Sequence, residues 1–380
     1  MVTDYRCWAE VDLEALRENL AWIRHRIGPG VKVLTVVKAD AYGHGLRQIA
    51  ALLMQSGTDV FGVANLAEAR AIRRVGKGWP ILMLGACLPN EVANAVRDEV
   101  MPVISTLAEA RRFSSEAVAQ RKTVSVHLKV DTGMGRLGSP PGRAVRLAAA
   151  LARLPGLALA GACTHFAAAE DDASFTREQL AGFTGVVTAL ERRGLRPPLI
   201  HASSSAGLLH EPEGLFNLVR PGLIAYGIAP AGQRFSPSQL PDQVRPALSW
   251  YCRVSLVKTV PAGLSLSYGR TYVTPRRMRV ATLTAGYGDG FLRAGSNRAM
   301  VLVGGRRCPV LGRVTMDQML VDVSSVRGVR PGDPVVLIGR QGRESISAGE
   351  LAGWGETVSW EVLTNISYRV PRLYLGGTAA

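Results

Sequence analysis

Short apolar runs recur between residues 31 and 223 of the chain, and amphipathic stretches separate them. The runs are rich in Val, Ile and Leu and do not alternate with polar residues, a pattern typical of parallel strands covered on both faces. They predict eight strands, at residues 31–37, 60–64, 81–84, 100–104, 124–130, 157–163, 199–202 and 218–223. The amphipathic stretches predict helices at residues 46–54, 66–75, 91–96, 107–118, 143–154 and 176–193.

This regular alternation of strand and helix is typical of a (β/α)8 barrel, and an open doubly wound sheet is the rival architecture. An open sheet places its ligand at one switch point in the strand order. A barrel instead gathers the loops that follow all of its strands on one face. We expect an α/β fold whose first part is a (β/α)8 TIM barrel.

The pattern changes after residues 230–246, a segment in which four prolines suggest a domain boundary: Pro230, Pro237, Pro241 and Pro246. Beyond it, glycine-containing turns separate alternating strands, and long helices nearly vanish. The strands are predicted at residues 251–260, 279–285, 300–303, 320–323 and 335–338, joined by an N-terminal strand at residues 5–11. We expect residues 10–243 to form the barrel, and residues 1–9 with 244–380 to form a mainly-β domain.

The formal net charge of +15 would suit a nucleic-acid partner. The arginines are spread along the chain, however, and short clusters such as Arg192-Arg193 are not interleaved with aromatic residues. Dispersed arginine is typical of a solvated surface, so we expect no nucleic-acid partner. No apolar run reaches the roughly 18 residues that cross a bilayer, and residues 1–10 lack the apolar core of a signal peptide. We expect a cytoplasmic protein that does not bind membranes.

The five cysteines lie far apart, without the paired spacing of a zinc or redox site. Their odd number fits reduced thiols in a reducing compartment. We expect them to be packing residues, and we expect no metal site.

Lys38 closes the first predicted strand and opens the loop that follows. A lysine at the end of a buried strand loses hydration, which lowers its pKa and frees the amine to attack a carbonyl carbon, as Schiff-base lysines do. A lysine whose stem merely carries its charge out to water would occupy the same position. Only six of the 45 basic residues are lysines, so the chain uses arginine where a positive charge is sufficient. That scarcity favours a chemical role for Lys38.

Polar residues also follow the other predicted strands. Each has a simpler explanation, since a buried histidine is often only a core residue and a serine cluster often caps a helix. The simpler explanations do not predict that all these residues share the face where barrel active sites lie. The residues are Lys38 and Tyr42 after the first strand, Arg136 after the fifth, His165 after the sixth, Ser203, Ser204 and Ser205 after the seventh, and Arg220 and Gly222 on the eighth.

Serine hydroxyls at a helix start, with the backbone N–H groups of Gly222 and Leu223 nearby, indicate an anion pocket suited to a phosphate. A phosphate pocket together with a desolvated lysine points to pyridoxal 5′-phosphate (PLP). The sequence contains no P-loop and no GxGxxG motif that would indicate a nucleotide instead.

With these residues assembled, the chain resembles the alanine racemases, a family of PLP enzymes built from a barrel and a β domain. The resemblance covers essentially the whole length. It rests on Tyr42-Gly43-His44-Gly45, residues 129–138, Thr164-His165-Phe166-Ala167, Arg220-Pro221-Gly222, Ser267-Tyr268-Gly269, residues 286–290, Met316-Asp317-Gln318 and residues 366–372.

The resemblance implies a role for each matching residue. Lys38 would hold PLP covalently, His165 would flank the ring, and Arg220 would face the pyridine nitrogen. Arg136 would neutralise the phenolic oxygen and bind the substrate carboxylate, for which a guanidinium fork is well suited. In some relatives the lysine matching Lys129 is carbamylated and orients that arginine. Further cofactor contacts are implied for Tyr42, Leu84, Ser204, Ser205, Gly222, Leu223 and Tyr368.

Racemisation removes the α-proton from one face of the substrate and returns it to the other, so two bases are expected. The resemblance implies Lys38 on one face and Tyr268 on the other, with Tyr268 supplied by the second subunit of a homodimer. A tyrosine hydroxyl keeps its proton at neutral pH unless cationic groups surround it, and the arginines of the site could do so. As a strand aromatic, Tyr268 could also be only a packing residue.

The same resemblance implies a small amino-acid substrate, because Met316 and Tyr368 would narrow the site. Tyr287, Arg293, Arg313 and Asp317 match residues of an access corridor. Two positions depart from the family pattern: Ser204 stands where asparagine is usual, and Thr315 where cysteine is frequent.

We therefore expect a homodimeric PLP enzyme that interconverts L- and D-alanine for peptidoglycan. A serine or broad-specificity racemase is the nearest alternative, since Ser204 could alter substrate choice. A PLP-dependent amino-acid decarboxylase of the same barrel fold is disfavoured, because those enzymes place an acid where this chain has Arg220. A non-catalytic PLP carrier would resemble the barrel alone.

Overall fold

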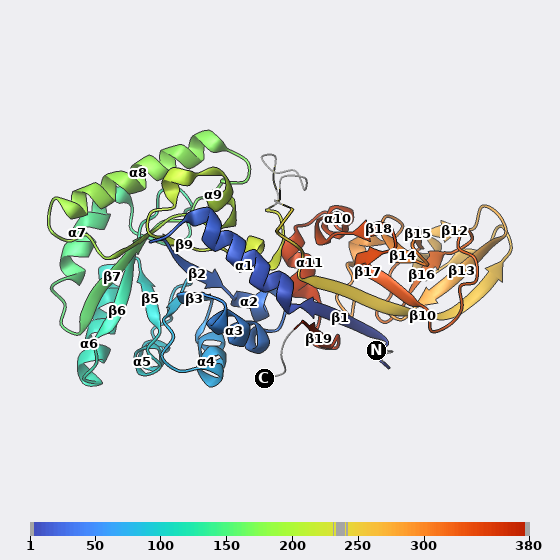
Figure 1. The fold of residues 1–380 in the computed structure, drawn as a ribbon, viewed down its shortest axis with the longest axis horizontal. Helices are drawn as coiled ribbons and strands as arrows, with labels where there is room; N and C mark the ends of the chain where they lie inside the picture. The colour runs from blue at the N-terminus through green and yellow to red at the C-terminus, as the bar shows by residue number, and fades with distance from the viewer. Residues whose placement is uncertain (1–3, 231, 233–239, 241, 377–380) are drawn as a thin grey trace. The chain divides into compact units, whose positions relative to one another are not determined.

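The computed structural model describes residues 4–230, 232, 240 and 242–376, which form two compact units (Figure 1). The barrel unit comprises the described parts of Arg17–Ala41 and Leu46–Val244. The β unit comprises the described parts of Met1–Leu16, Tyr42–Gly45 and Arg245–Ala380.

Eight parallel strands form the sheet of the barrel unit, in the order β8-β7-β6-β5-β4-β3-β2-β9. Two backbone hydrogen bonds join the outermost strands and the residues next to them: Arg220 N–H donates to Ser203 O over 2.9 Å, and Asn217 N–H donates to Ile200 O over 3.4 Å. The ring is thereby closed, and the prediction of a (β/α)8 barrel is confirmed. The strands are β2 (Lys32–Val36), β3 (Val60–Val63), β4 (Ile81–Met83), β5 (Met101–Ile104), β6 (Val124–Lys129), β7 (Leu157–Cys163), β8 (Leu199–His201) and β9 (Leu218–Val219).

Helices connect these strands, and α3, α4, α5 and α6 lie outside them in Figure 1. Local capping fixes where some of them begin. Asn65 caps α4 by accepting a hydrogen bond from Glu68 N, and Thr106 forms a capping box with Glu109 at the start of α6. The helices are α1 (Leu13–Ile27), α3 (Leu46–Gln55), α4 (Leu66–Val75), α5 (Val92–Arg97), α6 (Leu107–Ala119), α7 (Pro141–Leu151), α8 (Ala173–Glu191) and α9 (Ser205–His210), with 3₁₀ turns at Pro212–Gly214 and Leu223–Tyr226.

The eighth strand is shorter than the sequence predicts. The apolar run suggested residues 218–223, whereas β9 ends at Val219. Pro221 has no N–H to donate to a neighbouring strand, and the chain turns into the 3₁₀ segment at Leu223–Tyr226. Arg220 therefore follows the strand instead of lying within it.

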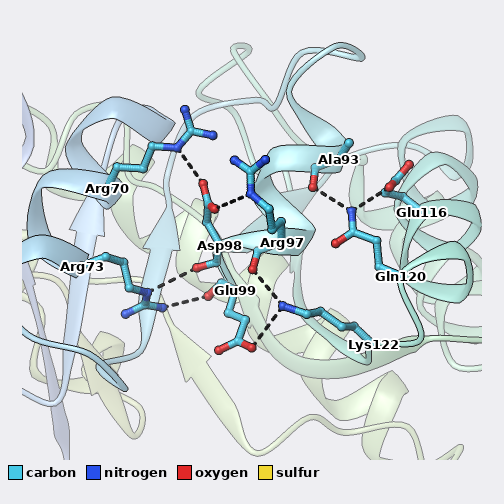
Figure 2. Close-up of polar contacts among 9 residues, drawn as sticks. All are labelled: Arg70, Arg73, Ala93, Arg97, Asp98, Glu99, Glu116, Gln120 and Lys122. Atoms are coloured by element: carbon cyan, nitrogen blue, oxygen red, sulfur yellow. Dashed lines mark hydrogen bonds and ion pairs between the residues drawn. The ribbon is translucent and has the colours of Figure 1, made fainter.

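A polar network holds the ends of α4 and α5 against the segments that lead into β4 and β5 (Figure 2). Arg73 donates to the backbone carbonyls of Trp79, Asp98 and Glu99. The Asp98 carboxylate accepts a 2.7 Å hydrogen bond from Arg70. These residues precede the strands, so the network lies at the N-terminal face of the barrel, which in barrel enzymes serves stability and not catalysis.

A nine-stranded sheet forms most of the β unit, in the order β18-β17-β14-β15-β16-β13-β10-β1-β19. The longest strand, β10, pairs with β1, β13 and β17, and β1 also pairs in parallel with β19. The strands are β1 (Cys7–Asp12), β10 (Leu248–Val260), β13 (Met278–Leu283), β14 (Met300–Val303), β15 (Arg306–Leu311), β16 (Met319–Asp322), β17 (Pro334–Gln341), β18 (Glu344–Ile346) and β19 (Arg372–Leu375). A hairpin of β11 (Ser265–Leu266) and β12 (Tyr272–Val273) and the helices α10 (Ala348–Trp354) and α11 (Ser359–Asn365) complete the unit.

Three strands of this sheet, β15, β18 and β19, have no counterpart in the predicted set. The first begins with the exposed residues Arg306 and Arg307, which interrupt the apolar pattern, and the others are only three and four residues long. Pro237 and Pro241 of the predicted boundary segment lie outside the described residues. In the part of the chain that the structure describes, no helix has the length and apolar character needed to cross a membrane.

Candidate active site

Lys38 lies two residues beyond the end of β2, at the face of the barrel where the strands end. Its amine is partly buried, and this burial lowers its pKa from the ordinary lysine value. The nearby Arg136 guanidinium lowers the pKa further, while Glu68 acts in the opposite direction. The desolvation predicted from the sequence is present, and the lysine is more easily deprotonated than one in water.

The chain after Lys38 forms a left-handed turn instead of the predicted loop. Ala39, Asp40, Ala41 and Tyr42 have φ between 53° and 55°, and this turn is the element α2 (Lys38–Tyr42). None of the four residues is glycine, so each pays a steric cost of about 1–2 kcal/mol. Strain of this kind persists only where surrounding contacts impose it, and it gathers at functional sites.

Two carboxylates impose this turn. Glu68 at the start of α4 accepts a 2.8 Å hydrogen bond from Ala39 N and a 2.7 Å bond from Ala64 N. Asp40 accepts a 2.7 Å bond from Leu46 N at the start of α3. The carboxylates thereby fix the backbone that carries Lys38, and the sequence reasoning missed Glu68.

Arg220 is buried and is held on several sides. Its Nη1 donates to His201 Nδ1 at 2.9 Å, and its Nη2 donates to the carbonyls of Thr164 and Ala202 at 2.9 and 2.7 Å. Nη2 also lies 3.2 Å from His165 Nδ1. This set of contacts fixes the guanidinium at the ends of β7 and β8.

The predicted residue His165 is a neutral base in this setting. Burial is the main reason that its pKa lies well below the ordinary histidine value, and the nearby Arg220 adds to the effect. An arginine can only donate hydrogen bonds, so His165 Nδ1 must be the acceptor of the contact with Arg220.

Gln179 of α8 holds the loops around His165 and was not predicted as a site residue. Its side chain is buried, accepts a 2.8 Å bond from Ala167 N, and donates to His165 O and to Thr132 Oγ1 over 3.3 and 3.2 Å. Because Gln179 is buried on a helix facing two active-site loops, its polarity was the signal that could have identified it.

Arg136 belongs to a loop that Asp131 organises. The Asp131 carboxylate accepts hydrogen bonds from Gly133 N and Gly135 N over 3.0 and 3.1 Å, and these bonds help to hold its pKa below the usual range despite partial burial. A Cβ at Gly138 would lie 2.6 Å from Asp131 N, so the loop closes only with glycine at that position. The loop presents the Arg136 side chain in an exposed position.

The predicted phosphate pocket is partly paired within itself. Ser205 is buried, and its Oγ accepts hydrogen bonds from Gly222 N over 3.1 Å and from Ile224 N over 3.2 Å. Because Oγ is the acceptor in both bonds, the Ser205 hydroxyl hydrogen is left to point elsewhere. Ser204 precedes α9 without a side-chain capping bond, and Leu84 follows β4. The Gly222 N–H is therefore a partner of Ser205, and not the open donor that the sequence suggested.

Tyr268 lies in the β unit on a strained turn. Its side chain is 71% exposed, and the flanking residues Ser267 and Arg270 have φ of 60° and 52°. Ser267 Oγ donates to Arg313 O over 2.6 Å, and a Cβ at Gly269 would lie 3.0 Å from Arg313 Cζ. A cation of the predicted access corridor is thus close to the turn that carries Tyr268.

The other predicted residues of the β unit share one loop cluster. Tyr287 N–H donates to Thr315 O over 3.0 Å, which joins the Tyr287 loop to the segment that carries Met316. Arg369 contacts Asp317 at 2.8 Å and Asp289 at 3.5 Å, and it follows the almost fully exposed Tyr368 in the chain. Tyr287, Met316 and Tyr368 are all exposed large side chains.

Comparison with known proteins bears on both units. The family model described as alanine racemase, N-terminal domain, matches residues 11–230, and the model described as alanine racemase, C-terminal domain, matches residues 247–374. The chain belongs to the alanine racemase family. It is 46% identical over 374 residues to the alanine racemase of Symbiobacterium thermophilum, with 98% of both chains covered, and 39% identical over 368 residues to that of Halothermothrix orenii, with 97% and 96% covered.

Solved alanine racemase structures have the same fold. The enzyme from Streptomyces lavendulae superposes with a TM-score of 0.92 at 35% identity, covering 99% of this chain and 98% of its own. The alanine racemase of Bacillus anthracis, solved with bound L-Ala-P, superposes with a TM-score of 0.89 at 36% identity, covering 98% of this chain and 96% of its own.

Alanine racemases depend on PLP, and the barrel unit fits such a group. Basic side chains that act on the neutral His165 include Arg220, Arg136 and Lys38. This concentration of positive charge suits a ligand that carries a phosphate and a phenolate. The Ser205 hydroxyl can donate a hydrogen bond to a phosphate oxygen, and the Lys38 amine can attack an aldehyde carbon.

Proposed function

We propose that this protein is a PLP-dependent alanine racemase that interconverts L- and D-alanine and supplies D-alanine for peptidoglycan. The observation that carries the proposal is the match of both alanine racemase domain models to one chain whose barrel presents Lys38 among Arg136, His165 and Arg220. Bound PLP withdraws electrons from the Cα of an amino acid attached to it, which makes the Cα–H acidic.

Within the barrel, the proposed assignments follow from the contacts described above. Lys38 Nζ would hold the cofactor and, when its amine is free, would use its lowered pKa to take up or return a proton on one face of the substrate. Arg220 would donate a hydrogen bond toward the pyridine nitrogen without giving up its proton, which favours racemisation over decarboxylation. Arg136 binds the substrate carboxylate and the phenolic oxygen.

The phosphate is assigned to the Ser205 hydroxyl, with Ser204, Leu223, Tyr42 and Tyr368 as further contacts, and Leu84 is assigned to the ring. Burial raises the pKa of Tyr42 to about 12, so its hydroxyl keeps its hydrogen and can donate it. Lys129, whose pKa burial lowers to about 8, is assigned as a carbamylated residue that orients Arg136.

We assign Tyr268 as the second base, acting on the opposite face of the substrate from the partner subunit of a homodimer. Its 71% exposure and the strained backbone around it support this role, because an exposed aromatic side chain held at such cost is not explained by packing. Met316, Tyr287 and Tyr368 limit the substrate to a small side chain. The protein acts in the cytoplasm.

One experiment tests the cofactor, its linkage and the reaction. The purified protein is incubated with PLP, and conversion of L-alanine to D-alanine is followed by chiral chromatography, with serine and lysine as competing substrates. Borohydride reduction followed by peptide mapping then locates the modified lysine, with Lys38→Ala as the control. If serine is turned over faster than alanine, serine and not alanine is the main substrate. Release of carbon dioxide would indicate a decarboxylase. A label on another lysine would refute the assignment of Lys38.

A further inference from the structure

A chain of hydrogen bonds runs from Arg220 into the interior of the barrel. Arg220 Nη1 lies 2.9 Å from His201 Nδ1, and His201 Nε2 lies 2.8 Å from His127 Nδ1 on β6. All three side chains are buried, and the two imidazole rings cross at 69°. Sequence reasoning identified Arg220 but neither histidine.

The chemistry of the first member fixes every proton in this chain. An arginine can only donate, so His201 Nδ1 must accept. A neutral imidazole has one donor and one acceptor, so His201 Nε2 carries the hydrogen and donates it to His127 Nδ1. His127 is then also an acceptor at Nδ1 and carries its own hydrogen at Nε2. Burial lowers the pKa of His127 to about 3 and that of His201 well below the ordinary value, which agrees with two neutral rings.

The last hydrogen of the chain points at no acceptor. Among the residues that the structure describes, His127 Nε2 is buried without a hydrogen-bond partner. A buried unpaired donor costs free energy that an apolar side chain of similar size would not cost. Packing alone therefore does not explain a histidine at this position.

The neighbouring strand makes room for the ring. The pairing of β6 with β7 shifts register between Val126 and His127, so that His127 pairs with Gly161. A Cβ at Gly161 would lie 2.3 Å from His127 Nδ1. The irregular pairing and the glycine together create the space in which Nδ1 meets His201.

We infer that His127 is a positioning residue, which holds His201 in its Nε2–H form so that His201 Nδ1 can hold Arg220. Without an acceptor at position 127, the Nε2–H of His201 would lose its buried partner, which weakens the preference for this form and, with it, the hold of His201 Nδ1 on Arg220. The inference rests on the proposed function, because Arg220 is the residue assigned to the pyridine nitrogen.

The first test needs no variant. Long-range ¹H–¹⁵N correlation spectra of histidine-labelled protein distinguish the two neutral imidazole forms, and the chain has only six histidines. We expect His127 and His201 both in the Nε2–H form. A hydrogen on Nδ1 of either ring, or a charged ring at neutral pH, would overturn the inference.

The second test uses two variants of nearly equal shape. His127→Asn keeps an oxygen near the position of Nδ1, whereas His127→Leu removes the acceptor. We expect His127→Leu to give a mixture of His201 forms and a kcat about tenfold below that of His127→Asn at unchanged KM, the effect of one lost hydrogen bond. If both variants keep His201 in the Nε2–H form, or lose kcat equally while remaining folded, His127 has only a structural role.

The proposed function and the positioning role of His127 can be refuted independently of each other. If the unmodified protein does not racemise alanine, the proposed function is wrong, while the spectra still decide whether His127 controls His201. If the protein racemises alanine but the spectra and the paired variants show that His127 does not influence the hydrogen position on His201, only this inference is wrong.

Discussion

Lys38 and Lys129, at the face of the barrel where the strands end, both have lowered pKa values. Burial is the main cause for both, and the Arg136 guanidinium acts on both amines. At neutral pH the desolvated amines carry a charge that the fold disfavours, and this cost in folding free energy is fully present below the folded pKa. Between the folded and the unfolded pKa the unfolded chain binds more protons than the folded one, so the cost fades as the pH rises toward the unfolded value of 10.5. The fold therefore maintains reactive amines at a cost in stability.

The lowered pKa of Lys129 predicts pH-dependent carbamylation. Only the neutral amine reacts with carbon dioxide, and with a pKa of about 8 the neutral fraction grows from pH 6 to pH 9. We expect a ¹³C carbamate signal after incubation with labelled bicarbonate at pH 8.5, its loss at pH 6, and its absence in Lys129→Gln. An equal signal at both pH values, or a signal in the variant, would contradict the assignment.

Replacing Tyr268 by Phe should separate the two faces of the reaction. The equilibrium constant between enantiomers is one, so the defect cannot appear in the ratio of the two overall rates. We expect racemisation to fall about 100-fold or more, the usual effect of losing a general base. In deuterated water, the Cα–H of one enantiomer should still exchange through Lys38 while that of the other does not, as followed by proton NMR. Equal exchange from both enantiomers would show that Tyr268 is not the second base.

At the scale of elements, the left-handed turn after Lys38 is held by Glu68 of α4 and by the link from Asp40 to α3. The Ala39 N–H and the Asp40 carboxylate both bond to residues outside the turn, so its conformation depends on the helices that follow the first two strands of the barrel. This dependence joins the packing of the barrel to the position of the lysine.

A pair of alanine-to-glycine substitutions measures the strain in this turn. Ala39→Gly should raise the free energy of unfolding by about 1 kcal/mol, because glycine adopts a positive φ without the clash of a Cβ. The matched control Ala21→Gly, at an exposed position inside the right-handed helix α1, should lower it by about 1 kcal/mol. Denaturant titration compares the two. Destabilisation of similar size at both positions would mean that the turn is not strained.

At the scale of the whole molecule, the residues assigned to the chemistry are divided between the two units. Lys38, Arg136, His165 and Arg220 belong to the barrel unit, whereas Tyr268 belongs to the β unit. If the second base comes from a partner subunit, each chain supplies one base to each of two sites.

Mixed dimers test this division. When Lys38→Ala and Tyr268→Phe chains are co-expressed in equal amounts, half of the dimers carry one of each, and one of their two sites has both bases. We expect about a quarter of the unmodified activity, although each variant alone is nearly inactive. No recovery in dimers shown by affinity tags to be mixed would mean that both bases come from the same chain.

The sequence determined the alternation of strands and helices that predicts a barrel, and most of the strands, because strands covered on both faces need apolar residues at nearly every position. It also determined that Lys38, Arg136, His165, Ser205 and Arg220 follow those strands, since chain order alone brings strand ends to one face of a barrel. The strands β15, β18 and β19 were not predicted, because two exposed arginines interrupt the apolar pattern at the start of β15, and β18 and β19 are only three and four residues long.

The tertiary structure decided the features that depend on contacts between segments far apart in the sequence. His201, His127 and Gln179 became visible only when their partners were in place, because a buried polar side chain is defined by what it bonds. The left-handed turn has no glycine signature, since Glu68 of a later helix and the bond between Asp40 and Leu46 hold it. The contacts that hold the Arg220 side chain likewise come from the carbonyls of Thr164 and Ala202 at the ends of other strands, and local sequence contains no record of those distances.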